Sequence, residues 1–236
     1  MKLLRLLCVL CAFVVHTHAD DFGKLIFEDT FDRTESQELK DEPGNEWTTA
    51  SEKTAQGNKQ VDLRDGHMYI YTHAAANHAT SVRHAFEFRD GTVGLRFKFD
   101  DPADSLTLYF ADMKLKSVHA GHLFKVVISS GQIQLIDQKI GDMNLKIRNA
   151  RKTKTITAAQ TKLLTTKRKV FRHKTDTGKW HTIHATLKGD QLSCTINGKQ
   201  IGTFSSEGFA HPTKRLLRLL APKNVHIDDV KIWCSR

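Results

Sequence analysis

Short runs in which every second residue is apolar fill most of this chain. Examples lie at 93–99, 106–110 and 192–196, and turn dipeptides such as Asp65-Gly66, Asp90-Gly91 and Asn197-Gly198 separate successive runs. A period of two is typical of strands with one buried face, and Asn-Gly or Asp-Gly supplies the backbone angles of tight hairpins. The pattern predicts an all-β fold of two packed antiparallel sheets. The expected strands are 24–28, 60–63, 68–72, 81–88, 93–99, 106–110, 123–129, 132–137, 180–188, 192–196, 200–204, 215–220 and 225–233.

One interval, 142–176, interrupts this pattern. Thr157 followed by Ala158-Ala159-Gln160 is typical of a helix N-cap and first turn, and Leu163, Leu164 and Val170 form a narrow apolar stripe. We therefore expect one short helix near 158–169, within an insertion between the strands at 132–137 and 180–188.

Positive charge is concentrated in the same insertion. The whole chain has a net charge of +10, and eleven Lys or Arg without an Asp or Glu lie between Lys146 and Lys174. Such a field attracts anionic polymers, and the alternative is a solvated face that the acidic remainder balances. The candidate anion-binding residues are Lys152, Lys154, Lys167, Arg168 and Lys169.

The N-terminus predicts export. Lys2 and Arg5 precede an apolar run at 6–15, and Thr17 and Ala19 place small residues at the −3 and −1 positions of a cleavage site. A run of this length is too short to anchor the protein in a bilayer. We expect a signal peptide over 1–19, cleavage near Ala19, a single domain over 20–236, and a periplasmic or extracellular location without a transmembrane segment. In that location nucleic acid is not an expected physiological partner.

Two cysteines follow the expected signal. Cys194 and Cys234 could form one disulfide in an oxidising compartment, or they could be two small buried hydrophobic side chains. Neither lies in a Cys-x-x-Cys motif or another setting that would lower its pKa, so neither is a candidate nucleophile.

The order of the landmarks resembles a known group. Phe27-Glu28-Asp29-Thr30-Phe31 opens the mature chain, Trp180-His181 leads into Gly189-Asp190 and Ile196-Asn197-Gly198-Lys199, and Ile227-Asp228-Asp229-Val230 lies near the end. The chain resembles the 3-keto-disaccharide hydrolase-like family of the concanavalin A-like (laminin-G-like) jelly rolls. The resemblance implies a sandwich whose concave face meets carbohydrate. The hydrolase members carry an Asn-Ser-Gly segment before an aromatic-Arg strand, but the stretch 105–110 lacks it, so no catalytic residue is carried over.

Carboxylates do not form the pattern that glycoside hydrolysis needs. Two acids must flank the scissile bond, and a jelly roll would supply them from a Glu-x-Asp-x-x-Glu strand, which this sequence lacks. The pairs Glu28-Asp29 and Asp228-Asp229 are expected to form bulges, caps or turns, because neighbouring residues of a strand face opposite sides.

Aromatic and histidine side chains are the candidate ligand-binding residues. Tyr69 and Tyr71 share the strand face opposite Met68 and Ile70, and their rings suit the apolar faces of sugars, although outward tyrosines are also common in ordinary strands. His119 and His122 lie in the loop before the strand at 123–129, without a local acid or cysteine that would complete a metal site. We expect no metal and no cofactor.

The sequence predicts an exported carbohydrate-binding jelly roll whose partner is an anionic polysaccharide. Two alternatives stay open, a hydrolase acting on 3-keto-glycosides or related glycosides, and a non-enzymatic protein that contacts an anionic envelope surface. Whether the chain is an enzyme does not follow from the sequence.

Overall fold

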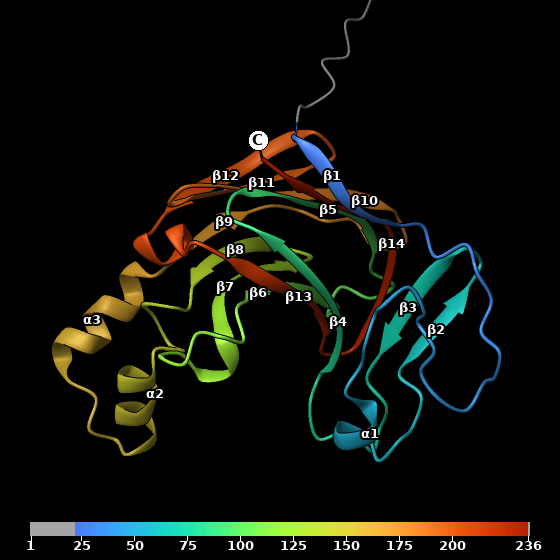
Figure 1. Cartoon of the computed structure of the whole chain (residues 1–236), viewed down its shortest axis with the longest axis horizontal. Coiled ribbons are helices and arrows are strands. Elements are labelled where there is room, and N and C mark those ends of the chain that lie inside the picture. The colour runs from blue at the N-terminus through green and yellow to red at the C-terminus, as the bar shows by residue number, and fades with distance from the viewer. Residues whose placement is uncertain (1–21, 236) are drawn as a thin grey trace, which may run out of the picture.

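The computed structural model describes residues 22–235, and the expected signal peptide and cleavage site lie outside them. Two curved antiparallel sheets form an arch, with α1 below one side and the helices α2 and α3 below the other (Figure 1). The predicted two-sheet sandwich is confirmed. None of the helices in this part of the chain is long and apolar enough to cross a membrane.

Sheet A forms the outer layer of the arch. Its order is β12-β11-β10-β5-β14-β3-β2, and β1 pairs with the second half of β14. A bulge in β14 lies between Asp228 and Lys231, where Asp229 has a positive φ of 50°. The structural role expected for Asp228-Asp229 is therefore confirmed. The strands are β1 (Lys24–Asp29), β2 (Val61–Arg64), β3 (His67–Tyr71), β5 (Gly91–Lys98), β10 (His181–Lys188), β11 (Gln191–Ile196), β12 (Lys199–Ser205) and β14 (Asn224–Cys234).

Sheet B forms the inner, concave layer in the order β4-β13-β6-β7-β8-β9 (Figure 1). Its strands are β4 (Thr80–Phe88), β6 (Ser105–Ala111), β7 (His122–Ser129), β8 (Gln132–Asp137), β9 (Arg168–Arg172) and β13 (Lys214–Ala221). The alternate apolar residues of both sheets, such as Leu108, Phe110 and Leu219, are buried between them. Their neighbours in sheet B therefore face the concave side.

The insertion contains more structure than the single helix that the sequence predicts. Helix α3 (Ala158–Thr166) begins at the expected cap, because the Thr157 hydroxyl accepts from the Gln160 backbone N–H and the Gln160 side chain accepts from the Thr157 N–H. It ends before 169, because the chain then pairs with β8 as the edge strand β9. Helix α2 (Leu145–Lys152) precedes it and buries only Ile147.

Three short helical segments complete the fold. They are α1 (Ser51–Thr54), η1 (His119–Gly121) and η2 (Glu207–Ala210). α1 lies in the long connection before β2, and η1 leads directly into β7.

The two cysteines are free, so the disulfide alternative is wrong. Cys194 on β11 and Cys234 on β14 are separated in sheet A by β10 and β5. Three strand spacings put them about 14 Å apart, well beyond the Cα separation of about 4.4–6.8 Å that a disulfide needs. Cys194 lies in the core and Cys234 packs against it, as the alternative of small hydrophobic side chains predicts.

We expect the two thiols to differ in reactivity. Burial raises the pKa of the Cys194 thiol to about 12, whereas Cys234 is partly exposed. Thiol titration with a disulfide reagent should therefore modify Cys234 first in the native protein, and both residues after unfolding in denaturant. Equal modification rates in the native protein would contradict the burial of Cys194.

Candidate active site on the concave face

A row of side chains crosses the whole concave face of sheet B at one register level. Cross-strand pairing places Arg83 opposite Arg218, Arg218 opposite Tyr109, and Tyr109 opposite Lys125. The pairing continues through Ile136 on β8 to Arg168 on β9. We call these six residues the basic row. At about 4.8 Å per strand it spans about 24 Å.

The neighbouring row of the same face carries no charge. This second row lies two residues farther along each strand. Cross-strand pairing aligns one residue from each of the six strands there, and all six side chains are neutral. The four cations are therefore confined to the basic row, and the neighbouring row of the same face does not share its positive charge. The neutral row consists of Ser81, Leu220, Thr107, Val127, Gln134 and Val170.

Three residues of the basic row line a small pocket of about 190 Å³, which we call the inner pocket. The sheet supplies Arg83, Arg218 and Tyr109, and the loops around α1 supply the wall opposite them. The fixed register explains why these side chains converge, although their strands lie far apart in the sequence. The remaining lining residues are Ala50, Thr54, His78, Ala79, Ser81, His122 and Leu220.

His122 and Arg218 form a partly buried pair in the inner pocket. Arg218 Nη1 donates to His122 Nε2 over 3.1 Å, and Arg218 Nη2 donates to the Ala120 carbonyl over 2.9 Å. Burial, together with the positive charge of Arg218, lowers the pKa of His122 to about 3. His122 therefore stays neutral near pH 7 and acts as an acceptor that orients the guanidinium group.

Tyr109 and Lys125 form the second pair. Lys125 Nζ lies 3.4 Å from the Tyr109 hydroxyl and 5.1 Å from the centre of its ring. The Tyr109 ring also lies 5.0 Å from His122. A phenol hydroxyl beside an ammonium group can exchange a proton with a bound ligand, because the adjacent positive charge stabilises negative charge on the oxygen.

A second, larger cleft of about 820 Å³ continues from the row toward the insertion, and we call it the outer cleft. Lys125, Ile136 and Arg168 belong to both the row and this cleft. Residues of the insertion, from α2 to β9, line one side of this cleft. The helices α2 and α3 of the insertion lie on the other side of the arch from α1 (Figure 1). The insertion also contributes Asp142, Arg151, Lys154, Ile156, Thr161, Leu164 and Lys167, and the other lining residues are Val127, Gln134, Asp137 and Gly141.

Carboxylates are scarce along this surface. None of the described lining residues of the inner pocket is acidic. Asp137 at the outer cleft is fully buried and accepts from Ser206 and from the Gly208 N–H. Asp142 is the remaining acid among the described lining residues. A pair of acids placed for glycoside hydrolysis is thus not formed here.

The residues that the sequence singles out are divided between the two sheets. His122 lines the inner pocket, and the ring of His119 lies 6.5 Å from that of His122 and within 3.4 Å of Arg148. Tyr69 and Tyr71 stack on each other on the outer face of sheet A, away from both cavities.

The five candidate anion-binding residues are divided in a similar way. Lys154, Lys167 and Arg168 line the outer cleft, whereas Lys152 and Lys169 are exposed outside it. Sequence reasoning missed Arg83, Tyr109, Lys125 and Arg218. The parity of each strand marks these residues as outward-facing, but only the register shows that they meet.

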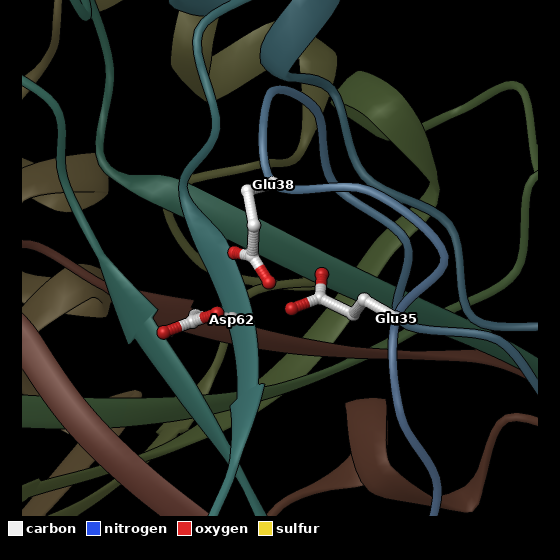
Figure 2. Close-up of side chains that lie close together, drawn as sticks. All are labelled: Glu35, Glu38 and Asp62. Atoms are coloured by element: carbon white, nitrogen blue, oxygen red, sulfur yellow. The ribbon is translucent and has the colours of Figure 1, made fainter.

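An acidic cluster around the start of β2, outside both cavities, is already filled. The carboxyl groups of Glu35, Glu38 and Asp62 converge as in a cation site (Figure 2). Lys59 Nζ lies between them, at 2.8, 2.7 and 2.9 Å from these three groups respectively. The ammonium group supplies the positive charge that a metal ion would otherwise provide, and we assign the cluster a structural role.

Three solved structures illustrate the likeness of this fold to known proteins. SCLam, a non-specific endo-β-1,3(4)-glucanase, is 13% identical with a TM-score of 0.60, and the match covers 90% of this chain and 91% of that one. The laminarinase from Rhodothermus marinus is 8% identical with a TM-score of 0.60, over 89% and 97%. The Bacillus licheniformis β-glucanase is 10% identical with a TM-score of 0.58, over 89% and 98%. At such identities the likeness shows the fold alone.

The family comparison is more specific. No curated protein matches the chain by sequence. A family model described as a 3-keto-alpha-glucoside-1,2-lyase-like domain matches residues 35–231, which include every residue of the basic row and both cavities. The resemblance inferred from the sequence is thereby confirmed, and the chain belongs to the 3-keto-alpha-glucoside-1,2-lyase-like family.

Proposed function

We propose that this protein cleaves a keto-sugar glycoside by elimination in the inner pocket. The observation that carries the proposal is the make-up of the pocket, which combines Tyr109 with Arg83 and Arg218 and contains no acid among its described lining residues. Two-carboxylate hydrolysis has no residues to use there. The family description, which names a 1,2-lyase of 3-keto-glucosides, supports the same class of reaction.

The chemistry of elimination matches these side chains. A carbonyl at C3 acidifies the C2–H bond, so a base can take that proton while the electron pair moves onto the carbonyl oxygen as an enolate. The C1–O bond then breaks as the C1=C2 bond forms, and the proton ends on the departing oxygen. The reaction consumes no water, and its demands are a proton carrier and positive charge near the enolate oxygen.

The pocket can meet both demands. We assign proton transfer to Tyr109, whose phenolate form takes the C2 proton and whose phenol then gives it to the departing oxygen, with the Lys125 ammonium group at 3.4 Å stabilising the phenolate. Arg83 and Arg218 supply positive charge, which is worth most in a water-poor site. His122 is a positioning residue, because its neutral ring accepts the hydrogen bond that holds Arg218.

Tyr109→Phe is expected to lower the rate of elimination by about 10²–10⁴-fold, the usual contribution of a positioned acid or base. The assay follows the absorbance of the unsaturated ketone formed from a 3-keto-α-disaccharide, with loss of the C2–H measured by NMR. The control, Thr195→Val, removes a hydroxyl from the outer face of sheet A and should leave the rate unchanged. Release of a keto-sugar that keeps its C2–H would instead indicate hydrolysis.

A second candidate is carbohydrate binding without turnover, with an anionic polysaccharide or an anionic envelope surface as the partner of an exported protein. The excess positive charge of the insertion favours it. Saturable binding of the keto-disaccharide with no product over many hours would support this candidate against the lyase.

A further inference from the structure

We propose that the substrate is an acidic oligosaccharide, whose carboxylate or sulfate groups lie along the basic row and whose chain continues from the inner pocket into the outer cleft. The inference rests on the proposed function, because it names the substrate class of the same site. It assigns a role to the insertion that the elimination chemistry does not require.

The cations of the basic row are not paired with carboxylates in the part of the chain that the structure describes. Among residues 22–235, none of the four cations Arg83, Arg218, Lys125 and Arg168 forms a salt bridge with a carboxylate. Arg83 and Arg218 lie on adjacent strands, and one strand separates each of the other neighbouring cations of the row. Like charges at these distances repel one another, and this repulsion opposes folding. A ligand with negative groups would remove that cost, so the row favours anions over neutral sugars.

The row also has a direction. It leads from the inner pocket through Lys125, which contacts Tyr109, and ends at Arg168 in the outer cleft. Its length of about 24 Å exceeds what a single sugar unit occupies. A sugar that reacts at Tyr109 therefore has its neighbouring units on the side of Lys125 and Arg168.

The outer cleft matches the two surfaces of an acidic sugar. Val127, Ile136, Ile156 and Leu164 give it an apolar lining, which suits the C–H faces of a pyranose ring. Cations surround that lining, and the guanidinium groups among them can hold a carboxylate or sulfate through two parallel hydrogen bonds. These cations are Lys125, Arg151, Lys154, Lys167 and Arg168.

A defined cleft and a diffuse positive field make different predictions about individual cations. Lys162 and Lys174 belong to the same insertion and are exposed, but they do not line the cleft. A diffuse field would weaken equally when any two of these charges are removed. A cleft would weaken only when its own lining residues are changed.

The test is calorimetric titration of the full-length protein with three hexasaccharides, an oligogalacturonate, a heparin fragment and a neutral laminarin fragment. We expect both acidic probes, or one of them, to bind at least about tenfold more tightly than the neutral one, a difference of about 1.4 kcal/mol. The better acidic probe identifies carboxylate or sulfate as the preferred group.

Two charge-matched double variants locate the binding. Lys154→Gln with Arg168→Gln should weaken acidic binding by about tenfold or more, whereas Lys162→Gln with Lys174→Gln should change it by about twofold or less. Equal weakening by both pairs would overturn the cleft in favour of a diffuse field, and equal affinity for the neutral probe would overturn the acidic class. If the acidic probes do not bind preferentially, the keto-disaccharide assay of the proposed function is unaffected, because the keto-disaccharide carries no acidic group.

Discussion

Replacing Lys59 with Met is expected to lower the free energy of unfolding by about 3–5 kcal/mol, the usual cost of removing one partner from a buried ionic cluster. The Lys59 side chain is only 9% exposed and contacts three carboxylates. One of them, Glu35, is 2% exposed and also accepts from the Leu63 N–H. Without the ammonium group, the buried Glu35 carboxylate would have no positive partner and would be repelled by Asp62 and by the exposed Glu38.

Urea denaturation of wild type and Lys59→Met at pH 7, with Lys179→Met as the exposed control, measures this loss. Lys179 is 70% exposed, so its ion pair with Asp176 is screened by solvent and should contribute little to stability. We also expect the deficit of Lys59→Met to shrink toward pH 4, since protonated carboxyl groups no longer repel, and to shrink when Ca²⁺ is added. A variant as stable as wild type at pH 7 would contradict the structural role of Lys59.

Replacing Asp29 with Ala should cost a similar amount, about 3–5 kcal/mol. Its buried carboxylate accepts two hydrogen bonds from Arg33, at 2.7 and 3.0 Å, one from the Phe31 N–H at 2.8 Å and one from Trp47 Nε1 at 2.8 Å. Burial opposes ionisation, but these hydrogen bonds outweigh it and lower the pKa of Asp29. The change to Ala leaves three groups of donors without their acceptor.

This network also holds one end of the basic row. The residue after Trp47 is Thr48, which exchanges two backbone hydrogen bonds with Arg83 at 2.8 Å each. Asp29→Ala should therefore lower the melting temperature by about 6–20 °C, at about 2–4 °C per kcal/mol for a chain of this length. Asp176→Ala, at an exposed ion pair, is the matched control and should shift it by about 4 °C at most.

The depressed pKa of Asp29 also predicts a dependence on pH. A carboxyl group whose pKa is lower in the folded state contributes stability that is present above its unfolded pKa and is lost as pH falls through the folded value. The stability difference between wild type and Asp29→Ala should therefore narrow below about pH 4, the ordinary range of an Asp carboxyl. A difference that stays constant down to pH 2 would contradict this assignment.

Much of the fold could be predicted because local signals agreed with the tertiary structure. Turn dipeptides such as Asn197-Gly198 predicted which neighbouring strands form hairpins. The alternation of apolar and polar residues along each strand predicted which side chains face the core. The insertion was harder, since α2 buries only Ile147 and therefore has almost no periodic signal. Val170 completed a helical stripe in the sequence, but pairing with Gln134 on β8 outweighed that weak preference.

The candidate site could be predicted only in part. The alternation along the strand correctly predicted that Tyr69 and Tyr71 face away from the core. It does not show which sheet the strand belongs to, and β3 belongs to sheet A. Arg218 and Tyr109 are adjacent in the fold and 109 residues apart in the sequence. Their meeting depends on sheet order and register, which one sequence does not reveal.

The strand β9 has a consequence for solubility. It is the edge of sheet B, so its outer backbone groups could pair with another molecule and begin aggregation. Lysine and arginine on an edge strand oppose such pairing, and β9 with the residues after it carries Arg168, Lys169, Arg172 and Lys174. The same charges that favour an acidic ligand thus also keep two copies of the chain apart, and variants that remove many of them at once should become prone to self-association.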